Sequence, residues 1–184
     1  MSALVEFRDV AFAYPRPERR RERTFGFAGL SFAIEPGEVF GVIGPNSAGK
    51  TTLLRLLTRV LEPARGDIVL DARSIRALAQ EPRLLVLDEP TAHLDLRYQA
   101  ETAALLRRLN RERGMTILLV SHDLNLAAEL CDRLLLLRAG EIARVGAPVE
   151  VLEQTLLESV FGCRVVVDKS ASGQPVVQLA YERG

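Results

Sequence analysis

A phosphate-binding loop is the first chemistry that the sequence offers. Residues 44–51 read GPNSAGKT and fit the pattern G-x-x-x-x-G-K-[S/T]. In such a loop, backbone N–H groups and the N-terminus of the next helix point at a phosphate, because both carry partial positive charge. An apolar strand-like run precedes the loop, and leucines at helical spacing follow it. The pattern predicts an ATP site, and the alternative is a glycine-rich turn without a ligand.

Individual roles follow from the side chains of this loop. Lys50 would reach the β- and γ-phosphates with a compact ammonium group, and it is one of only two lysines among 24 basic residues. The Thr51 hydroxyl would bind Mg²⁺, and Thr52 could hydrogen-bond the α-phosphate. Ser47 would cost about 1 kcal/mol if its φ is positive. The other loop positions predicted to contact the nucleotide are Gly44, Asn46, Ala48 and Gly49.

Two adjacent acids end the apolar run RLLVLDE. Since successive strand residues point in different directions, Asp88 could face Mg²⁺ while Glu89 polarises the attacking water. His122 follows a second apolar run, TILLVS, and residues at the carboxyl ends of parallel strands line the ligand crevice of an α/β sheet. We therefore expect His122 near the γ-phosphate. The alternatives are a solvated turn for the acid pair and a helix-capping neighbour for the histidine.

The elements that must position these residues alternate between apolar strands and amphipathic helices. This alternation predicts an α/β fold with a largely parallel sheet, and the N-terminal β segments are expected to form a small antiparallel layer. Strands are predicted over 3–14, 30–38, 38–44, 66–71, 83–88, 115–121, 133–140 and 141–146, and helices over 50–61, 74–80, 97–114, 123–131 and 148–161.

Length and composition set the broad class. A chain of 184 residues predicts one domain, 1–184, in which 148–184 forms a C-terminal helix and a β-like tail. Its 24 basic and 24 acidic residues give zero net charge, which argues against a surface that coats nucleic acid. No apolar run approaches the roughly 18 residues that span a bilayer, and no secretory signal is evident. Cys131 and Cys163 are expected to be reduced thiols, and the basic run 16–23 a solvated loop.

Three stretches resemble the nucleotide-binding subunits of ABC transporters: GPNSAGKTTLLRLL, LLVLDEPTAHLDL and VSHDLNLAAELCDRLLLLRAGEIARVGAP. The tail VLEQTLLESVFGCRVVV is most similar to the branch that powers uptake of iron-siderophores, haem and cobalamin. The resemblance implies a RecA-like P-loop NTPase core with a mainly parallel sheet and a small antiparallel β subdomain. It also implies that Tyr14 stacks on adenine and that 92–95 forms the D-loop between two subunits.

The same resemblance implies an ATPase that uses ATP and Mg²⁺. Its partners would be membrane permease subunits and, in the family, a second copy of the chain, with no nucleic acid. Its location would be cytoplasmic, peripheral at the inner face of the cell membrane.

The interval between Lys50 and Asp88 is much shorter than in that family. Family members carry there a Q-loop glutamine, a helical subdomain and an LSGGQ-type signature, whereas here GDIVLDAR runs directly into SIRALAQEPRLLVLDEP. Gln80 ends the RALAQEP helix and is not expected to be the Q-loop glutamine. We therefore expect a core without these three features. ATP-driven dimer closure should be weak, because the signature supplies several charge-assisted hydrogen bonds of roughly 1.5–3 kcal/mol each.

Two functions remain open from the sequence. One is the ATP-binding subunit of an ABC importer, which couples ATP hydrolysis to uptake of an iron chelate (siderophore or haem) or cobalamin. The other is a truncated or engineered nucleotide-binding core that binds ATP without productive hydrolysis or transport. Further alternatives are a longer natural chain from which a segment is omitted, and a DNA-repair or translation-associated ABC protein. Turnover that depends on Glu89 separates the first two.

Overall fold

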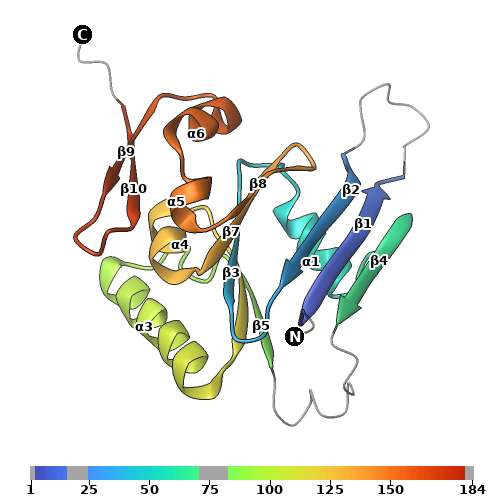
Figure 1. Cartoon of the computed structure of the whole chain (residues 1–184), viewed down its shortest axis with the longest axis horizontal. Coiled ribbons are helices and arrows are strands. Elements are labelled where there is room, and N and C mark those ends of the chain that lie inside the picture. The colour runs from blue at the N-terminus through green and yellow to red at the C-terminus, as the bar shows by residue number, and fades with distance from the viewer. Residues whose placement is uncertain (1–2, 16–24, 71–82, 181–184) are drawn as a thin grey trace.

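A five-stranded sheet forms the centre of the molecule in a computed structural model that describes residues 3–15, 25–70 and 83–180 (Figure 1). Four of its strands run parallel, and β8 returns antiparallel to β7. In spatial order the strands are β5 (Leu84–Asp88), β6 (Thr116–Val120), β3 (Val39–Ile43), β7 (Arg133–Arg138) and β8 (Glu141–Gly146). This arrangement confirms the predicted α/β fold with a mainly parallel sheet.

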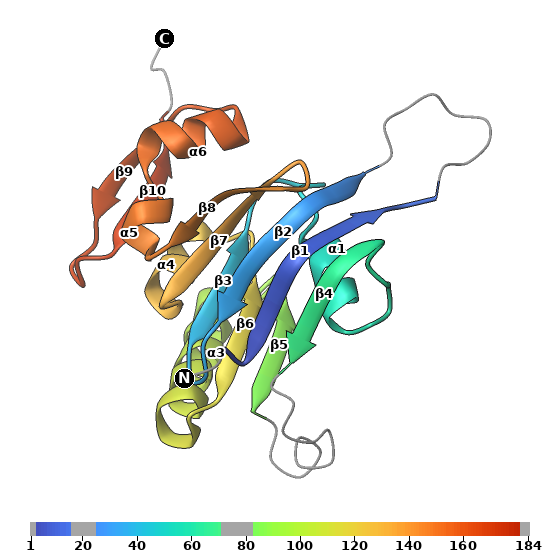
Figure 2. The same ribbon diagram turned by 45° about the vertical axis from the view of Figure 1, so that its right-hand side comes forward.

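A second, antiparallel sheet packs against one face of the central sheet (Figure 2). Its strand order is β2–β1–β4, with bounds Gly26–Ile34, Val5–Ala13 and Arg65–Leu70. The predicted antiparallel layer is confirmed. The structure adds β4 to it and starts β2 at Gly26 rather than at residue 30. Helix α1 (Lys50–Leu57) joins the same apolar core, so the phosphate loop is anchored between the two sheets.

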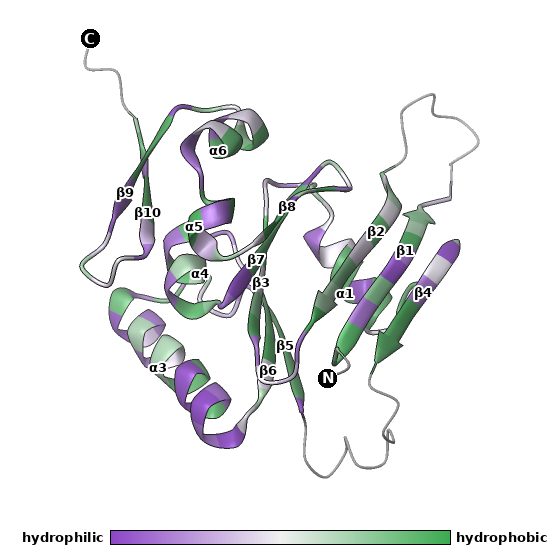
Figure 3. Cartoon of the chain, in the orientation of Figure 1, coloured by the Kyte–Doolittle hydropathy of each residue, from purple (hydrophilic) through white to green (hydrophobic). Residues whose placement is uncertain are grey.

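In the described part of the chain, the other face of the central sheet is covered by the helices α3 (Leu96–Arg113), α4 (Leu124–Leu130), α5 (Pro148–Val151) and α6 (Gln154–Phe161). Side chains along β6 alternate between the two cores, with Leu118 in the first and Leu119 in the second. This alternation is the expected period of a strand covered on both faces. Figure 3 accordingly shows the inner strands as hydrophobic and α3 as mixed.

Helix α1 ends four residues earlier than predicted. The periodic leucines favour a helix over 50–61, but the Thr58 hydroxyl donates a hydrogen bond to the Leu54 carbonyl, and Arg59 has a φ of 56°. A left-handed residue cannot continue an α-helix. The chain therefore turns at residue 58 toward β4.

The C-terminal part contains two short helices where the sequence predicted one, and the stretch expected to be a β-like tail forms a two-stranded hairpin. The break lies at Leu152, and the Glu153 side chain accepts hydrogen bonds from the N–H groups of Thr155 and Leu156 to start α6. The hairpin pairs β9 (Val165–Lys169) with β10 (Pro175–Leu179). No helix within the described ranges is both long and apolar enough to cross a membrane.

Three sequence predictions fall outside the described residues. They are the basic run 16–23, the helix 74–80 with Gln80, and the junction between GDIVLDAR and SIRALAQEP.

Candidate functional site

The carboxyl ends of β3, β5 and β6 meet at one edge of the central sheet. Asp88 pairs with Val120 in the parallel register, and the Glu89 N–H donates to the Val120 carbonyl at 2.9 Å. The Ser121 N–H donates to the Val42 carbonyl at 3.2 Å. The residues that follow these strands, Glu89 and His122, therefore lie beside the loop that follows β3.

The loop after β3 has the backbone of a phosphate cradle. Gly44, Ser47 and Gly49 all have positive φ, at 148°, 62° and 112°. A Cβ at Gly49 would collide with the rings of Phe25 and Phe27, so only glycine fits there. The Gly140 N–H, from the turn between β7 and β8, donates to the Ala48 carbonyl at 3.0 Å. The loop is thus held from both sides, by the rings of Phe25 and Phe27 and by the N–H of Gly140.

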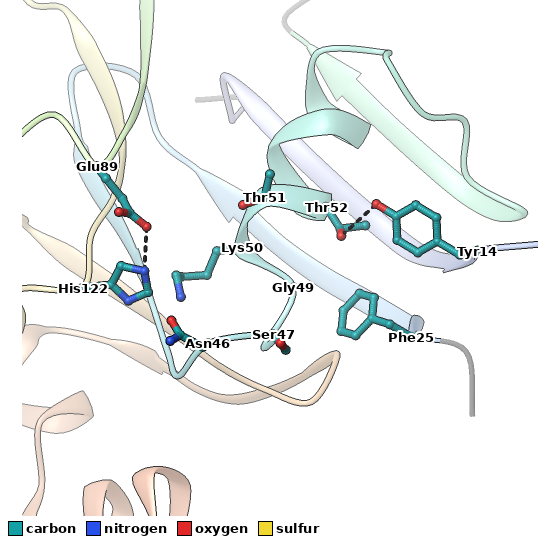
Figure 4. A pocket seen from close by; sticks show the side chains of 10 residues that line it. All are labelled: Tyr14, Phe25, Asn46, Ser47, Gly49, Lys50, Thr51, Thr52, Glu89 and His122. Carbon is teal, nitrogen blue, oxygen red and sulfur yellow. Dashed lines mark hydrogen bonds and ion pairs between the residues drawn. The ribbon is translucent and has the colours of Figure 1, made fainter. Parts of the chain in front are cut away.

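A cavity of about 330 Å³ opens above this loop, within the size range of small-molecule sites (Figure 4). It is lined by Tyr14, Phe25, Asn46, Ser47, Gly49, Lys50, Thr51, Thr52, Glu89 and His122. Nine of these ten residues were named from the sequence. Gly44, Ala48 and Asp88 were also named but do not line the cavity. Gly44 is buried and its carbonyl accepts a hydrogen bond from the Lys50 ammonium, Ala48 is buried in the core, and Asp88 is exposed at the end of β5.

Lys50 is the buried cation of the site, with 6% of its surface exposed. Its ammonium donates to the carbonyls of Gly44 at 2.8 Å and Pro45 at 3.1 Å. Burial lowers the pKa of Lys50, and the carboxylates of Glu89 and Asp88 act in the opposite direction. Among the described residues Lys50 forms no ion pair. Its charge is therefore available to an anion in the cavity.

Glu89 and His122 touch directly, with His122 Nε2 2.6 Å from Glu89 Oε1. Both side chains are partly exposed to the cavity, as Figure 4 shows. Glu89 has a φ of 51°, an uncommon conformation for a residue with a Cβ. Strained backbone of this kind concentrates at functional sites. The sequence placed the two residues at neighbouring strand ends but did not predict their contact.

Two aromatic rings stand at the other end of the cavity. Tyr14 and Phe25 are joined by a backbone hydrogen bond of 3.3 Å between the ends of β1 and β2. The Tyr14 hydroxyl lies 3.3 Å from the Thr52 hydroxyl, within hydrogen-bond distance. Sequence reasoning missed Phe25. Its signal was the aromatic pair in TFGF, directly after the basic run.

Thr51 and Asp88 are the two oxygen donors that the sequence predicts for Mg²⁺. No cluster of three or more histidine, cysteine, aspartate or glutamate residues was found within the described ranges. One hydroxyl and one carboxylate suit Mg²⁺, which retains several waters and shares ligands with substrate phosphates. Thr51 lines the cavity, and the negative charge of Asp88 acts to raise the pKa of Lys50. The donor set therefore fits Mg²⁺ together with a nucleotide.

Replacing Ser47 with glycine is expected to stabilise the protein by about 1 kcal/mol, because glycine adopts a φ of 62° without the penalty that a Cβ imposes. Urea unfolding followed by circular dichroism measures the difference. Ser47→Ala is the matched control, since alanine keeps the Cβ and should give no gain. Equal stability of Ser47→Gly and Ser47→Ala would show that the loop is not strained at this residue.

The sequence matches a known family and many curated proteins. The family model described as "ABC transporter" matches residues 27–77. Petrobactin import ATP-binding protein FpuC of Bacillus anthracis is 30% identical, over 77% of this chain and 83% of FpuC. Hemin import ATP-binding protein HmuV of Rhodopseudomonas palustris is 30% identical, over 84% of this chain and 90% of HmuV. Ferric enterobactin transport ATP-binding protein FepC of Escherichia coli is 28% identical, over 80% of this chain and 86% of FepC.

Solved structures share the fold at lower sequence identity. The inward-facing conformation of a metal-chelate type ABC transporter superposes with a TM-score of 0.79 at 18% identity, covering 98% of this chain and 99% of that chain. The dimeric ATP-binding cassette MJ0796 bound to ADP and Pi superposes with a TM-score of 0.68 at 19% identity, covering 78% of this chain and 98% of that chain.

The alignments with the curated relatives are longer than the chain itself. The alignment with FpuC runs over 225 positions, and this chain has 184 residues. FpuC therefore carries residues that have no counterpart here.

Proposed function

The chain belongs to the family of ABC transporter ATP-binding proteins, and on that premise we propose that it is the ATP-binding subunit of an importer for an iron chelate or haem. The names of its relatives FpuC, HmuV and FepC support this substrate class. They favour iron chelates and haem over cobalamin, which the sequence had left open. The single observation that carries ATP binding is Lys50, a buried cation held by loop carbonyls beneath the cavity.

Triphosphate binding follows from that loop. The ammonium of Lys50 would exchange its carbonyl partners for β- and γ-phosphate oxygens, which form stronger, charge-assisted hydrogen bonds. Loop N–H groups and the N-terminus of α1 add partial positive charge at the same place. Gly44, Asn46, Ala48 and Gly49 would contribute through their backbone or amide groups, and Thr52 through its hydroxyl.

Mg²⁺ would be held by Thr51 and Asp88 together with the phosphates, where it neutralises charge on the β- and γ-oxygens. Glu89 would then orient the attacking water, and His122 would hydrogen-bond the γ-phosphate. The 2.6 Å contact between Glu89 and His122 brings both groups to one point of the cavity, which supports these roles.

A second candidate is a nucleotide-binding core that does not turn over productively. The observation that favours it is the length of the relatives' alignments, together with the short interval between Lys50 and Asp88. This is the interval in which we expect the helical subdomain, Q-loop and signature to be missing. Without them, closure of a dimer around ATP and docking on a permease would both be weak.

Partners and location follow the same premise. A membrane permease at the inner face of the cell membrane would be the docking partner, and a second copy of the chain would complete the working unit. MJ0796 is described as a dimer and the metal-chelate type protein as a transporter.

The test is calorimetric titration of the full chain with Mg-ATP, followed by steady-state hydrolysis. Saturable binding with turnover supports the importer subunit. Binding without turnover supports the nucleotide-binding core. Absence of binding under both low and physiological salt overturns the proposal.

Replacing Tyr14 with alanine is expected to weaken ATP binding about tenfold, because stacking of a base on an aromatic ring contributes about 1–3 kcal/mol. Binding of inorganic tripolyphosphate, which has no base, should stay within about twofold of the wild-type value, since the phosphate loop is unchanged. Competition against a fluorescent nucleotide measures both affinities. Equal losses for the two ligands would mean that Tyr14 acts through its hydrogen bond to Thr52 and not through adenine.

A further inference from the structure

Helix α4 begins at Leu124, two residues after His122, with Asp123 as its N-cap. The Asp123 side chain caps the helix by accepting hydrogen bonds from the N–H groups of Asn125 and Leu126. The Asp123 N–H donates in turn to the Ser121 hydroxyl at 3.0 Å. His122 is therefore fixed between the end of β6 and the first turn of α4, and its position depends on where that helix lies.

The first turn of α4 is bonded to the C-terminal hairpin. Asn125 Nδ2 donates to the Val177 carbonyl at 3.2 Å, and the Val177 N–H donates to Asn125 Oδ1 at 2.7 Å. The amide side chain thus satisfies both backbone groups of one residue of β10, as a neighbouring strand would. β10 lies along α4 (Figure 1).

The last turn of α4 is bonded to the same hairpin. Glu129 accepts hydrogen bonds from the hydroxyls of Ser172 at 2.5 Å and Ser170 at 3.3 Å, in the turn between β9 and β10. Arg107 of α3 donates to the Glu129 carboxylate at 3.3 Å and to its carbonyl at 2.7 Å. The hydrogen bond from Ser172 is the main reason that the pKa of Glu129 is lowered.

These bonds lie on the outer side of a helix that is already packed. Ala127, Ala128 and Leu130 bury the inner side of α4 against the central sheet. The hairpin joins the same apolar cluster through Val165, Val167 and Val177. The hairpin adds hydrogen bonds at both ends of α4. Because hydrogen bonds are directional, they fix the rotation of the helix and its height on the sheet, which apolar contacts alone do not fix.

We propose that the β9–β10 hairpin positions His122, and that Asn125 and Glu129 are the residues through which it acts. The hairpin holds α4 at its two ends, α4 holds Asp123 and His122, and His122 reaches Glu89 in the cavity. This gives a role to the C-terminal tail, which nucleotide chemistry leaves unused. The consequence for turnover rests on the proposed function, whereas the consequence for the His122 ring does not.

The experiment follows the histidine rings directly in the nucleotide-free protein. The chain has two histidines, so ¹⁵N-labelled imidazoles give two sets of signals, and a His93→Gln variant identifies those of His122. Asn125→Ala in the full chain is expected to move the His122 signals and leave those of His93 in place. The affinity for Mg-ATP should stay within about twofold of wild type, while kcat falls about fivefold, because a displaced group loses part of a hydrogen bond.

Asn110→Ala is the matched control. Asn110 also bonds the backbone, at the carbonyls of Gly37 and Met115, but at the opposite edge of the sheet from the cavity. The Asn110→Ala variant should therefore have the same His122 signals and the same kcat as the wild type. If Asn125→Ala fails to fold, Ser172→Ala removes one hydroxyl at the other end of α4 and answers the same question.

Unchanged His122 signals in folded Asn125→Ala or Ser172→Ala overturn the positioning role, whatever the ATPase result. Failure of the proposed function is seen separately, as absence of Mg-ATP binding by the wild-type chain.

Discussion

Lys50→Ala is expected to weaken Mg-ATP binding by about a hundredfold or more. The ammonium can form two charge-assisted hydrogen bonds to phosphate oxygens, each of about 1.5–3 kcal/mol, and about 1.4 kcal/mol corresponds to tenfold in affinity. The fold should tolerate the change, because burial already opposes the charged form of Lys50. Calorimetric titration measures the affinity, and circular dichroism checks the fold.

The control for this prediction is provided by the sequence itself. Lys169 is the only other lysine, and it is exposed in the C-terminal hairpin. Lys169→Ala removes the same charge from the chain and should bind Mg-ATP as the wild type does. An equal loss of Mg-ATP affinity in both variants would point to general electrostatic attraction. An unchanged affinity in Lys50→Ala would show that residues 44–51 are not the phosphate-binding loop.

Replacing Glu89 with glutamine is expected to have the second large effect, on the turnover rate. In a chain that turns over ATP, the substitution should lower kcat by about a hundredfold to ten-thousandfold, the contribution typical of a positioned general base. Affinity for Mg-ATP should be retained, because the amide removes a negative charge that faces the phosphates. A steady-state phosphate-release assay with a parallel binding titration separates the two quantities.

Glu101→Gln is the matched control for the loss of a carboxylate. Glu101 is exposed on α3 and pairs with Arg97, remote from the cavity. Turnover of Glu101→Gln should equal that of the wild type. If Glu89→Gln also keeps wild-type turnover, Glu89 does not activate the water. If the wild type turns over no faster than Glu89→Gln, the chain is a nucleotide-binding core.

The phosphate loop and the strand ends could be predicted because their signals are local. GPNSAGKT specifies its own backbone, and an apolar strand before it and a helix after it supply the context. Asp88, Glu89 and His122 were named for the same reason, since each lies within two residues of the end of an apolar strand. The rule that parallel strands expose their carboxyl ends at one edge predicts the same edge for all three, and Glu89 and His122 line the cavity there.

The contact between Glu89 and His122 could not be predicted, because it depends on non-local geometry. It requires the register of β5 against β6 and the left-handed φ of Glu89. Phe25 was missed for a related reason. Only the pairing of β1 with β2 brings its ring beside Tyr14, and no spacing in the sequence reports that register.

The boundary of α1 and the break at Leu152 were also missed, and here side-chain hydrogen bonds compete with periodicity. Leucine spacing continues past residue 57, but the Thr58 hydroxyl bonds back to the helix and Arg59 leaves helical φ. At the second place, the Glu153 carboxylate satisfies the first N–H groups of a new helix. Apolar patterns carry no information about such caps.

The central position of β3 has a consequence for the order in which the protein is made. β3 pairs with β6 and β7, both of which leave the ribosome long after β3 does. The hydrogen bond from the Gly140 N–H to the Ala48 carbonyl likewise cannot form until residue 140 has been made. During synthesis the phosphate loop therefore emerges early, and its support from β6, β7 and Gly140 comes only after most of the chain has followed. Such long-range pairing makes folding slow, because the entropy of closing a large loop is lost before the contacts form. The phosphate loop is thus translated early, and its contact with the turn between β7 and β8 can form only late.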